Sequence, residues 1–297
     1  MTTTTVMPPA DTVDSAKASA SGRVSRGSKH PVLLHVALLA GLILMVGPFV
    51  WMIISSFKTT GELRQLPPTF IPEEPTLTNY RDLFDRLDFP RYFFNSTVVA
   101  LCVTAGNLLF CSMVGYALAK LEFAGKRVLL VIVLATLMVL GTVTFMPQFV
   151  LISNMGLANT HAALILPTVV GALGVFLMRQ FIGGIPDELL DAARIDGAGE
   201  YRIFFKIILP LCGAPLATLA ILTFLGSWNA FLWPLVVAST EDMYTLPVAL
   251  SLFAIGQQET NVALQMAGAV VVVLPVVVLF LAMQRYVIQG IATTGIK

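Results

Sequence analysis

Six long apolar runs that lack acidic residues are the feature that most constrains this chain. Each run exceeds the roughly 20 residues that a helix needs to cross the hydrocarbon core of a bilayer. Because lipid offers the backbone no hydrogen-bonding partner, segments that span it must be helical. The sequence therefore predicts an all-α polytopic membrane protein with six transmembrane helices. The runs cover residues 31–57, 93–118, 128–151, 161–182, 211–238 and 264–284.

The low content of charge agrees with this class. Charged residues make up 12% of the chain, whereas soluble domains contain about 25%. Residues 1–30 are rich in Thr, Ser, Ala and Pro, and their lack of apolar periodicity predicts disorder. We expect a transmembrane domain over residues 31–290 and a short tail over residues 291–297. The three cysteines lie in apolar surroundings without a ligand pattern, so no metal site is expected.

Lysine and arginine are distributed unevenly between the two ends of the predicted spans. Thirteen of the 18 lie before the first run, around the connections that follow the second and fourth runs, or after the sixth. The other five lie between residues 58 and 91, where acidic residues balance them. Cytoplasmic loops of membrane proteins carry the excess of basic residues. This distribution predicts that both termini lie in the cytoplasm.

The connection between the fourth and fifth runs is unusually rich in charge. It reads ELLDAARIDGAGEYRIFFKIILP over residues 188–210. Acidic residues directly after Pro186 favour a helix start, and Gly197 favours a helix end. A second short helix is predicted over residues 200–208. The small alanines would allow close approach of another protein, so the residues alone leave open a docking surface or a solvated connector.

The spacing in this connection resembles the EAA loop of bacterial ABC importer permeases. The family pattern is E-A-A, three residues, G, nine residues, then I-x-L-P, and residues 191–210 match it from Asp191 to Pro210. The sequence departs at one position, where Asp191 stands in place of the usual glutamate. The resemblance implies a cytoplasmic coupling helix that docks on an ATPase subunit. The residues expected to carry this coupling are Asp191, Ala192, Ala193, Asp196, Gly197, Ala198, Leu209 and Pro210.

Three further stretches resemble the permeases of maltose-type sugar importers, and the last of them resembles the tail of the second, shorter permease. They are residues 95–126, the sequence WNAFLWPL at 228–235, and the C-terminal sequence QRYVIQGIATTGIK at 284–297. The resemblance implies a heterodimeric pore in the bacterial inner membrane, made with a second homologous permease. It also implies two cytoplasmic ABC ATPases, which bind ATP and Mg²⁺, an extracytoplasmic solute-binding protein and a sugar-like solute. No nucleic-acid partner is expected.

The chain lacks the features of two other classes of transport protein. It contains no G-x-x-x-x-G-K-[ST] phosphate loop, so it is not expected to be an enzyme or to bind a cofactor itself. The absence of acids from the runs argues against a proton-coupled carrier, which needs an ionisable group at membrane depth. An ABC permease for a non-sugar solute remains the alternative, followed by a secondary carrier or channel.

Four polar or aromatic residues within the runs are candidates for the translocation pathway. Buried polar groups in lipid are costly and face the bundle interior, where they line a pore or join helices by hydrogen bonds. Tryptophan can stack on a sugar, although it more often serves packing. The residues alone leave these alternatives open. The candidates are Asn107, Gln148, Trp228 and Asn229.

The resemblance also implies roles for a loop and for the C-terminal tail. The loop before the sixth run lies where the second maltose-type permease reaches its binding protein, although its composition alone indicates an ordinary polar connector. The tail is expected to reach the interface between the two ATPases. The candidates for binding-protein contact are Gln257, Gln258, Glu259 and Asn261, and those for ATPase contact are Thr293, Thr294, Gly295 and Lys297.

Overall fold

The structure is a computed structural model that describes residues 31–86, 88–256 and 261–294. All of the secondary structure in these residues is helical, which confirms the all-α prediction. The predicted disorder of residues 1–30 lies outside the described part of the chain.

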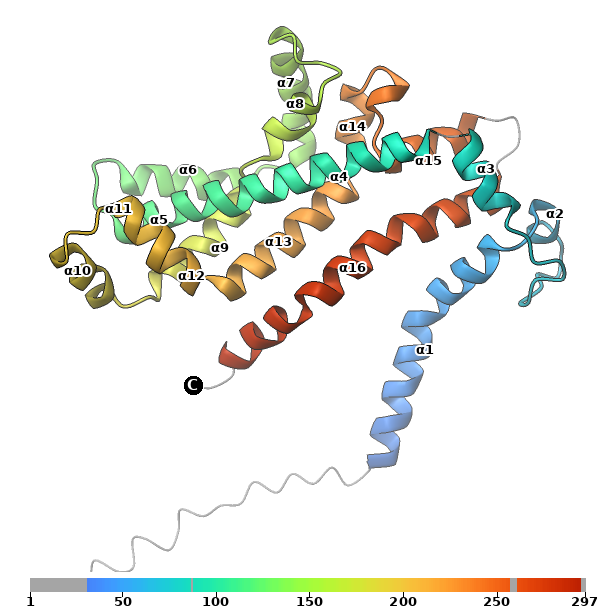
Figure 1. Cartoon of the computed structure of the whole chain (residues 1–297), viewed down its shortest axis with the longest axis horizontal. Coiled ribbons are helices and arrows are strands. Elements are labelled where there is room, and N and C mark those ends of the chain that lie inside the picture. Colours follow the sequence, from blue (N-terminus) through green and yellow to red (C-terminus); the bar gives the residue numbers. More distant parts are fainter. Residues whose placement is uncertain (1–30, 87, 257–260, 295–297) are drawn as a thin grey trace, which may run out of the picture. The chain divides into compact units, whose positions relative to one another are not determined.

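The chain forms two compact units, Met1–Phe49 and Val50–Lys297. Helix α1 (Pro31–Ser56) begins in the first unit and ends in the second. A polar loop with two short helices, α2 (Thr60–Leu63) and α3 (Thr78–Arg86), follows it. The remaining helices, described below, belong to the second unit (Figure 1).

Among the described residues, three helices are long and apolar enough to cross a membrane, namely Leu34–Ser56, Phe89–Lys120 and Val262–Ala282. Three further apolar stretches consist of two helical segments that are bent by more than 40° at a short break. The number of spans becomes six if each bent pair crosses once. The six predicted runs overlap these stretches, although the third bent pair, Glu200–Leu211 with Gly213–Trp228, begins before the predicted run at 211–238. Hydropathy could not detect the bends.

The third predicted span, 128–151, is broken into α6 (Lys126–Met138) and α7 (Gly141–Asn154), which are bent by 107°. Val139 and Leu140 adopt extended backbone at the break, with ψ of 123° and 129°. Both residues are as apolar as their helical neighbours, so the hydropathy of the run gives no sign of the break.

The fourth and fifth predicted spans are also interrupted. In the fourth, α8 (His161–Ile165) and the 3-10 turn η3 (Leu166–Thr168) are bent by 44° from α9 (Ala172–Gly183). In the fifth, the run 211–238 is divided between α13 (Gly213–Trp228) and α14 (Leu232–Val237). Neither run is therefore a single straight helix.

The end of the chain is more helical than the sequence predicts. The loop between the fifth and sixth runs contains a short turn, η5 (Glu241–Met243), and an apolar helix, α15 (Leu246–Gly256). The last helix, α16 (Val262–Thr294), continues beyond the boundary at residue 290.

The helix from Phe89 to Lys120 organises the second unit. It consists of α4 (Phe89–Gly106), a π-helical turn η2 (Asn107–Cys111) and α5 (Ser112–Lys120). α4 lies against α13, which also contacts α16, and α5 lies against α9 (Figure 1). We call Phe89–Lys120 the long helix. It joins two polar regions that are on the order of 40 Å apart along its axis.

Asn107 locks the π-turn of the long helix to the break between η3 and α9. Its Nδ2 donates to the carbonyl oxygens of Val103 (3.1 Å) and Thr168 (2.8 Å), and its Oδ1 accepts from the amide of Gly171 (3.0 Å). The side chain is buried. These bonds support the helix-joining alternative for Asn107 and satisfy backbone groups that the helix break leaves without helical partners.

We expect Asn107→Leu to destabilise the chain by about 1–3 kcal/mol, because Gly171 N–H and Thr168 C=O would lose a buried partner. The measurement is the thermal unfolding midpoint of the detergent-solubilised chain. Asn229→Leu is the matched control, since Asn229 is exposed and bonds only to Leu225 of its own helix. Equal midpoints for Asn107→Leu and the control would show that the hydrogen bonds of Asn107 do not stabilise the chain.

Candidate functional site

The loop between α9 and α13 folds as two helical segments joined at Gly197, as the sequence predicts. We call residues 187–203 the helical corner. α10 (Asp187–Ile195) begins directly after Pro186. It ends where the amide of Gly197 bonds to Arg194 O and that of Ala198 to Ala193 O, each at 3.0 Å. This pair of bonds is a Schellman motif, which requires a left-handed residue. Gly197 has φ of +79°, so the corner depends on glycine at this position.

A second helical segment leads from the corner into the fifth apolar run. It consists of α11 (Glu200–Ile203), the π-turn η4 (Phe204–Ile208) and α12 (Leu209–Leu211). The turn to α13 then bends the chain by 81°. Of the eight residues that were predicted to carry coupling, Leu209 and Pro210 lie in α12 and the other six lie between Asp191 and Ala198.

One apolar side chain fixes α10 to the body of the protein. Leu190 is 1% exposed, and it belongs to a buried cluster with Ile182 and Ile185 before the loop and Ile203 and Ile208 after it. Burial of a leucine side chain contributes roughly 1.5–3 kcal/mol. The loop is therefore a packed element rather than a loose connector.

Two polar contacts hold the loop against the end of the long helix. Lys120 Nζ donates to Asp187 Oδ1 (2.6 Å) and to the carbonyl oxygen of Ile185. The hydroxyl of Tyr116 donates to Glu200 Oε2. The hydrogen bond and charge of Lys120 lower the pKa of the Asp187 carboxyl. Both sides of the loop are thus tied to α5 as well as to α9 and α13.

Asp191, at the acidic position of the motif, pairs within its own loop. Arg194 donates from Nη1 to Asp191 Oδ1 and from Nε to Glu200 Oε1, both at 2.9 Å. The side chain of Asp191 is 63% exposed, so this pair leaves it accessible.

The outward side of the loop exposes large apolar side chains that the sequence prediction missed. Ile195 is 86% exposed and Tyr201 is 74% exposed, while Leu189 is half-exposed beside the exposed Ala192. Leu189, Ala192 and Ile195 recur at intervals of three, which places them near one another on α10. Sequence reasoning also missed Tyr116 and Lys120, although their i, i+4 spacing at the end of a span was a usable signal.

The remaining pathway candidates lie in different environments. Gln148 is half-buried on α7, and Asn229 is exposed at the end of α13. Trp228 is 1% exposed, its indole N–H donates to Val272 O (3.0 Å), and its ring stacks on Phe224. Trp228 is thus enclosed within this subunit and is not brought together with Gln148 or Asn107.

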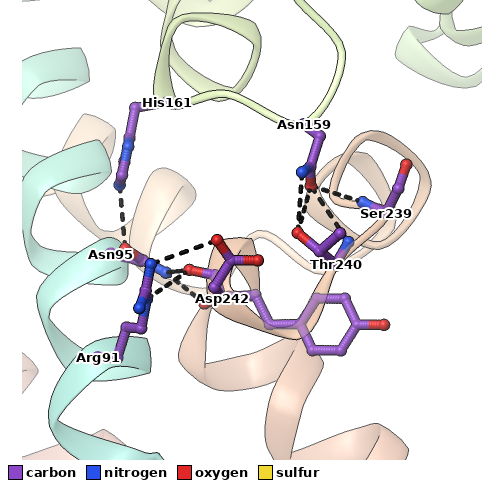
Figure 2. A network of polar contacts seen from close by, with 8 residues as sticks. Arg91, Asn95, Asn159, His161, Ser239, Thr240 and Asp242 are labelled. Atoms are coloured by element: carbon purple, nitrogen blue, oxygen red, sulfur yellow. Dashed lines mark hydrogen bonds and ion pairs between the residues drawn. The ribbon is translucent and has the colours of Figure 1, made fainter.

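A polar network joins three segments at the opposite end of the long helix (Figure 2). Asn95 Nδ2 donates to the carbonyl oxygens of Asp242 (2.9 Å) and Tyr244 (3.0 Å). Its Oδ1 lies 3.0 Å from His161 Nε2. Because the amide nitrogen of Asn95 already donates twice, its oxygen accepts and Nε2 of His161 carries the hydrogen. Arg91 reinforces the network by donating to Asp242 O (3.0 Å) and Asp242 Oδ2 (3.3 Å).

Asn159 forms the second part of this network. Its Oδ1 accepts from the amides of Ser239 (2.9 Å) and Thr240 (3.2 Å), and its Nδ2 donates to the Thr240 hydroxyl (2.8 Å) (Figure 2). The residue has φ of +60°, a left-handed conformation that asparagine tolerates. The loop before α8 is therefore fastened to the loop after α14. No single local pattern in the sequence indicates this contact.

The other predicted sites are only partly within the described residues. Asn261 precedes α16, where its Oδ1 accepts from Leu264 N (3.0 Å) and from the Thr60 hydroxyl (2.9 Å). Thr293 and Thr294 end α16. The candidates Gln257, Gln258, Glu259, Gly295 and Lys297 lie outside the described part of the chain.

Neither end of the long helix offers a metal centre. Within residues 31–86, 88–256 and 261–294, no three His, Cys, Asp or Glu side chains are grouped so that they could hold a metal ion.

A curated family model, described as binding-protein-dependent transport system inner membrane component, matches residues 111–293. The arabinooligosaccharides transport system permease protein AraQ of Halalkalibacterium halodurans is 41% identical, over 89% of this chain and 96% of that protein. The lactose transport system permease protein LacG of Rhizobium radiobacter is 33% identical, over 87% of this chain and 94% of that protein.

A solved structure has the same fold. The crystal structure of a bacterial ABC transporter involved in the import of the acidic polysaccharide alginate matches with a TM-score of 0.75 and 22% identity. The match covers 86% of this chain and 95% of that chain. The relatives are transport components rather than enzymes. The chain therefore belongs to the family of binding-protein-dependent transport system inner membrane components and is a permease subunit of an ABC importer.

Proposed function

We propose that this permease forms half of a pore that imports an oligosaccharide or a related sugar-like solute. The observation that carries the proposal is the 41% identity, over nearly the whole chain, to a permease named for arabinooligosaccharides. A second relative is named for lactose, another short saccharide. A second homologous permease would complete the pore, two ABC ATPases would bind ATP and Mg²⁺, and a binding protein would deliver the solute.

The test is solute-dependent ATP hydrolysis by the reconstituted complex with its binding protein. We expect arabinooligosaccharides and other short saccharides to stimulate the ATPase rate, and amino acids and dipeptides to leave it at the basal value. Stimulation by amino acids or peptides alone would favour the non-sugar alternative. Uptake that follows an ion gradient and needs no ATP would instead favour a secondary carrier.

The same proposal includes a topology of six spans with both termini in the cytoplasm. The uneven distribution of lysine and arginine supports it. Lys120, Arg194 and Arg202 all lie at or beside the helical corner, at one end of the long helix. Arg91 and the polar network of Asn95 lie at the other end. The corner would then face the cytoplasm and the network would face the binding protein.

We assign ATPase docking to the helical corner, which contains the first part of the predicted coupling motif, from Asp191 to Ala198. Its exposed Ile195 and Tyr201 support this assignment, because large apolar side chains grouped on a polar surface are typical of a protein interface. Movement of the ATPases would pass through Leu190 into the core. It would also pass through Tyr116 and Lys120 into the long helix.

Asp191→Asn is expected to weaken ATPase assembly about tenfold, as the loss of one partly desolvated charge contact would. The chain itself should keep its stability, because exposed ion pairs such as Asp191–Arg194 contribute about 1 kcal/mol or less. The measurement is the amount of ATPase that co-purifies with the permease. Asp191→Glu should be tolerated and should retain the ATPase, since glutamate is usual at this position of the motif.

Glu188→Gln serves as the matched control, because Glu188 is an exposed acid on the same helix outside the motif. If Asp191→Asn retains as much ATPase as Glu188→Gln does, the carboxylate of Asp191 serves only its own loop.

The remaining assignments extend the same proposal. Gln148 and Asn229 are the pathway candidates that are not enclosed like Trp228 and Asn107, so contact with the solute or the partner permease is open to them. The loop at 257–261 would reach the binding protein. Residues 293–297 would reach the ATPases, supported by the continuation of α16 to Thr294.

A further inference from the structure

A cavity of about 640 Å³ opens where α5, α6 and α9 meet. Its wall combines the end of α5, the connection that follows it and the start of α6 with one residue of α9. It lies outside the helical corner and outside the polar network. The residues that line it are Leu118, Glu122, Phe123, Gly125, Lys126, Arg127, Val128, Leu130 and Arg179.

The cavity is cationic. Lys126, Arg127 and Arg179 contribute three positive charges, and Glu122 contributes one negative charge, which leaves a net charge of +2. Glu122 pairs with Lys126 at 2.9 Å, so its carboxylate already has a cationic partner. Neither arginine of the lining has an ion pair within the residues that the structure describes.

Arg179 is the residue that most clearly lacks a partner. It lies near the end of the apolar helix α9, and its Nε is buried without a hydrogen-bond partner in the described structure. Arg179 as a whole is half-buried, and a buried N–H group without an acceptor, such as its Nε–H, is costly. An anion in the cavity would supply the missing acceptor. A guanidinium is well suited to a phosphate because its donors match two phosphate oxygens.

The other half of the wall is apolar, and this favours a lipid over a soluble anion as the ligand. Leu118, Phe123, Val128 and Leu130 line the cavity beside the cations. It continues onto α6, where Val128, Val131 and Ile132 are exposed on a candidate membrane segment. A ligand here meets cations on one side and hydrocarbon on the other. A phospholipid presents this combination, with its phosphate next to its glycerol and acyl chains.

We propose that this cavity binds the phosphate of an anionic phospholipid, held by Arg179 and Arg127 with its acyl chains along α6. The site is distinct from the solute pathway and the ATPase contact. The lipid stabilises the packing of α5, α6 and α9.

The experiment uses the assembled complex, delipidated in neutral detergent and titrated with phosphatidylglycerol or phosphatidylcholine. Native mass spectrometry measures the fraction of complex that carries lipid. We expect preferential binding of phosphatidylglycerol, and an affinity about tenfold lower in Arg179→Gln, as loss of a charged hydrogen-bond partner predicts. Arg127→Gln provides a second variant at an exposed position, which tests the site even where Arg179→Gln fails to assemble.

Arg81→Gln is the matched control, because Arg81 is an exposed arginine of α3, outside both the cavity and the helical corner. Its binding of phosphatidylglycerol should equal that of the unmodified chain. Equal binding by all three variants would overturn the proposal, since it would show only attraction to net charge. Competition by millimolar inorganic phosphate that abolishes lipid binding would also overturn it in favour of a soluble anion.

Discussion

Gly197→Val is expected to insert into the membrane normally but to lose most of its ATPase partner. Gly197 has φ of +79°, and no atom lies within 4 Å of the position where a Cβ would stand. The penalty is therefore backbone strain rather than a collision, and it amounts to about 1–2 kcal/mol for a side chain that carries Cβ. Relief of that strain would break the bond from Ala198 N to Ala193 O and turn α11 away from α10.

A strain of this size corresponds to a loss of binding of about five- to thirtyfold. The measurement is the ATPase that co-purifies with the permease, together with transport by the reconstituted complex. Two variants isolate the cause. Gly197→Asn should be largely tolerated, because asparagine accepts positive φ. Gly199→Val, two residues away, should also be tolerated, since Gly199 has φ of −73° and open space around it.

If Gly199→Val loses as much co-purifying ATPase as Gly197→Val does, backbone strain at Gly197 is not the cause of the loss. The prediction is also contradicted if Gly197→Val co-purifies and transports like the unmodified chain. In that case the motif glycine would not be required for the corner.

Gly115→Val is expected to destabilise the packing of α5 against α9. A Cβ on Gly115 would lie 2.9 Å from the amide nitrogen of Arg179 and 2.9 Å from Met178 Cβ. The first of these atoms is backbone, so α5 and α9 would have to separate. Insertion of extra volume into a packed core costs about 1–3 kcal/mol. Met178 is fully buried at this contact, so the cluster that anchors Leu190 would be disturbed as well.

The measurement is the thermal unfolding midpoint of the solubilised chain, followed by coupled ATP hydrolysis in the complex. Gly183→Ala is the control, because Gly183 ends the same helix α9 and no atom lies within 4 Å of the place that its new methyl group would take. A midpoint for Gly115→Val that matches the control would show that α5 and α9 need not approach this closely.

The sequence by itself determined the all-α fold class and the helical corner between the fourth and fifth apolar runs. Apolar runs longer than a bilayer crossing require helices whatever they pack against, so hydropathy was sufficient. The helical corner was also predictable, because it depends on local sequence. The start of its first helix after Pro186 and the end of that helix at Gly197 depend on residues only a few positions apart, and the structure confirms both.

Only the tertiary structure decided where the apolar runs bend and which distant residues meet. The bend of 107° at Val139 and Leu140 occurs within a run whose hydropathy remains high enough overall to predict a single span. Asn95 meets Asp242, and Tyr116 meets Glu200, across more than 80 residues of chain. Such contacts are fixed by the packing of the helices, because each polar side chain needs a partner that its own segment does not supply. Sequence periodicity is local, so it determined the elements, while three-dimensional packing determined the contacts between them.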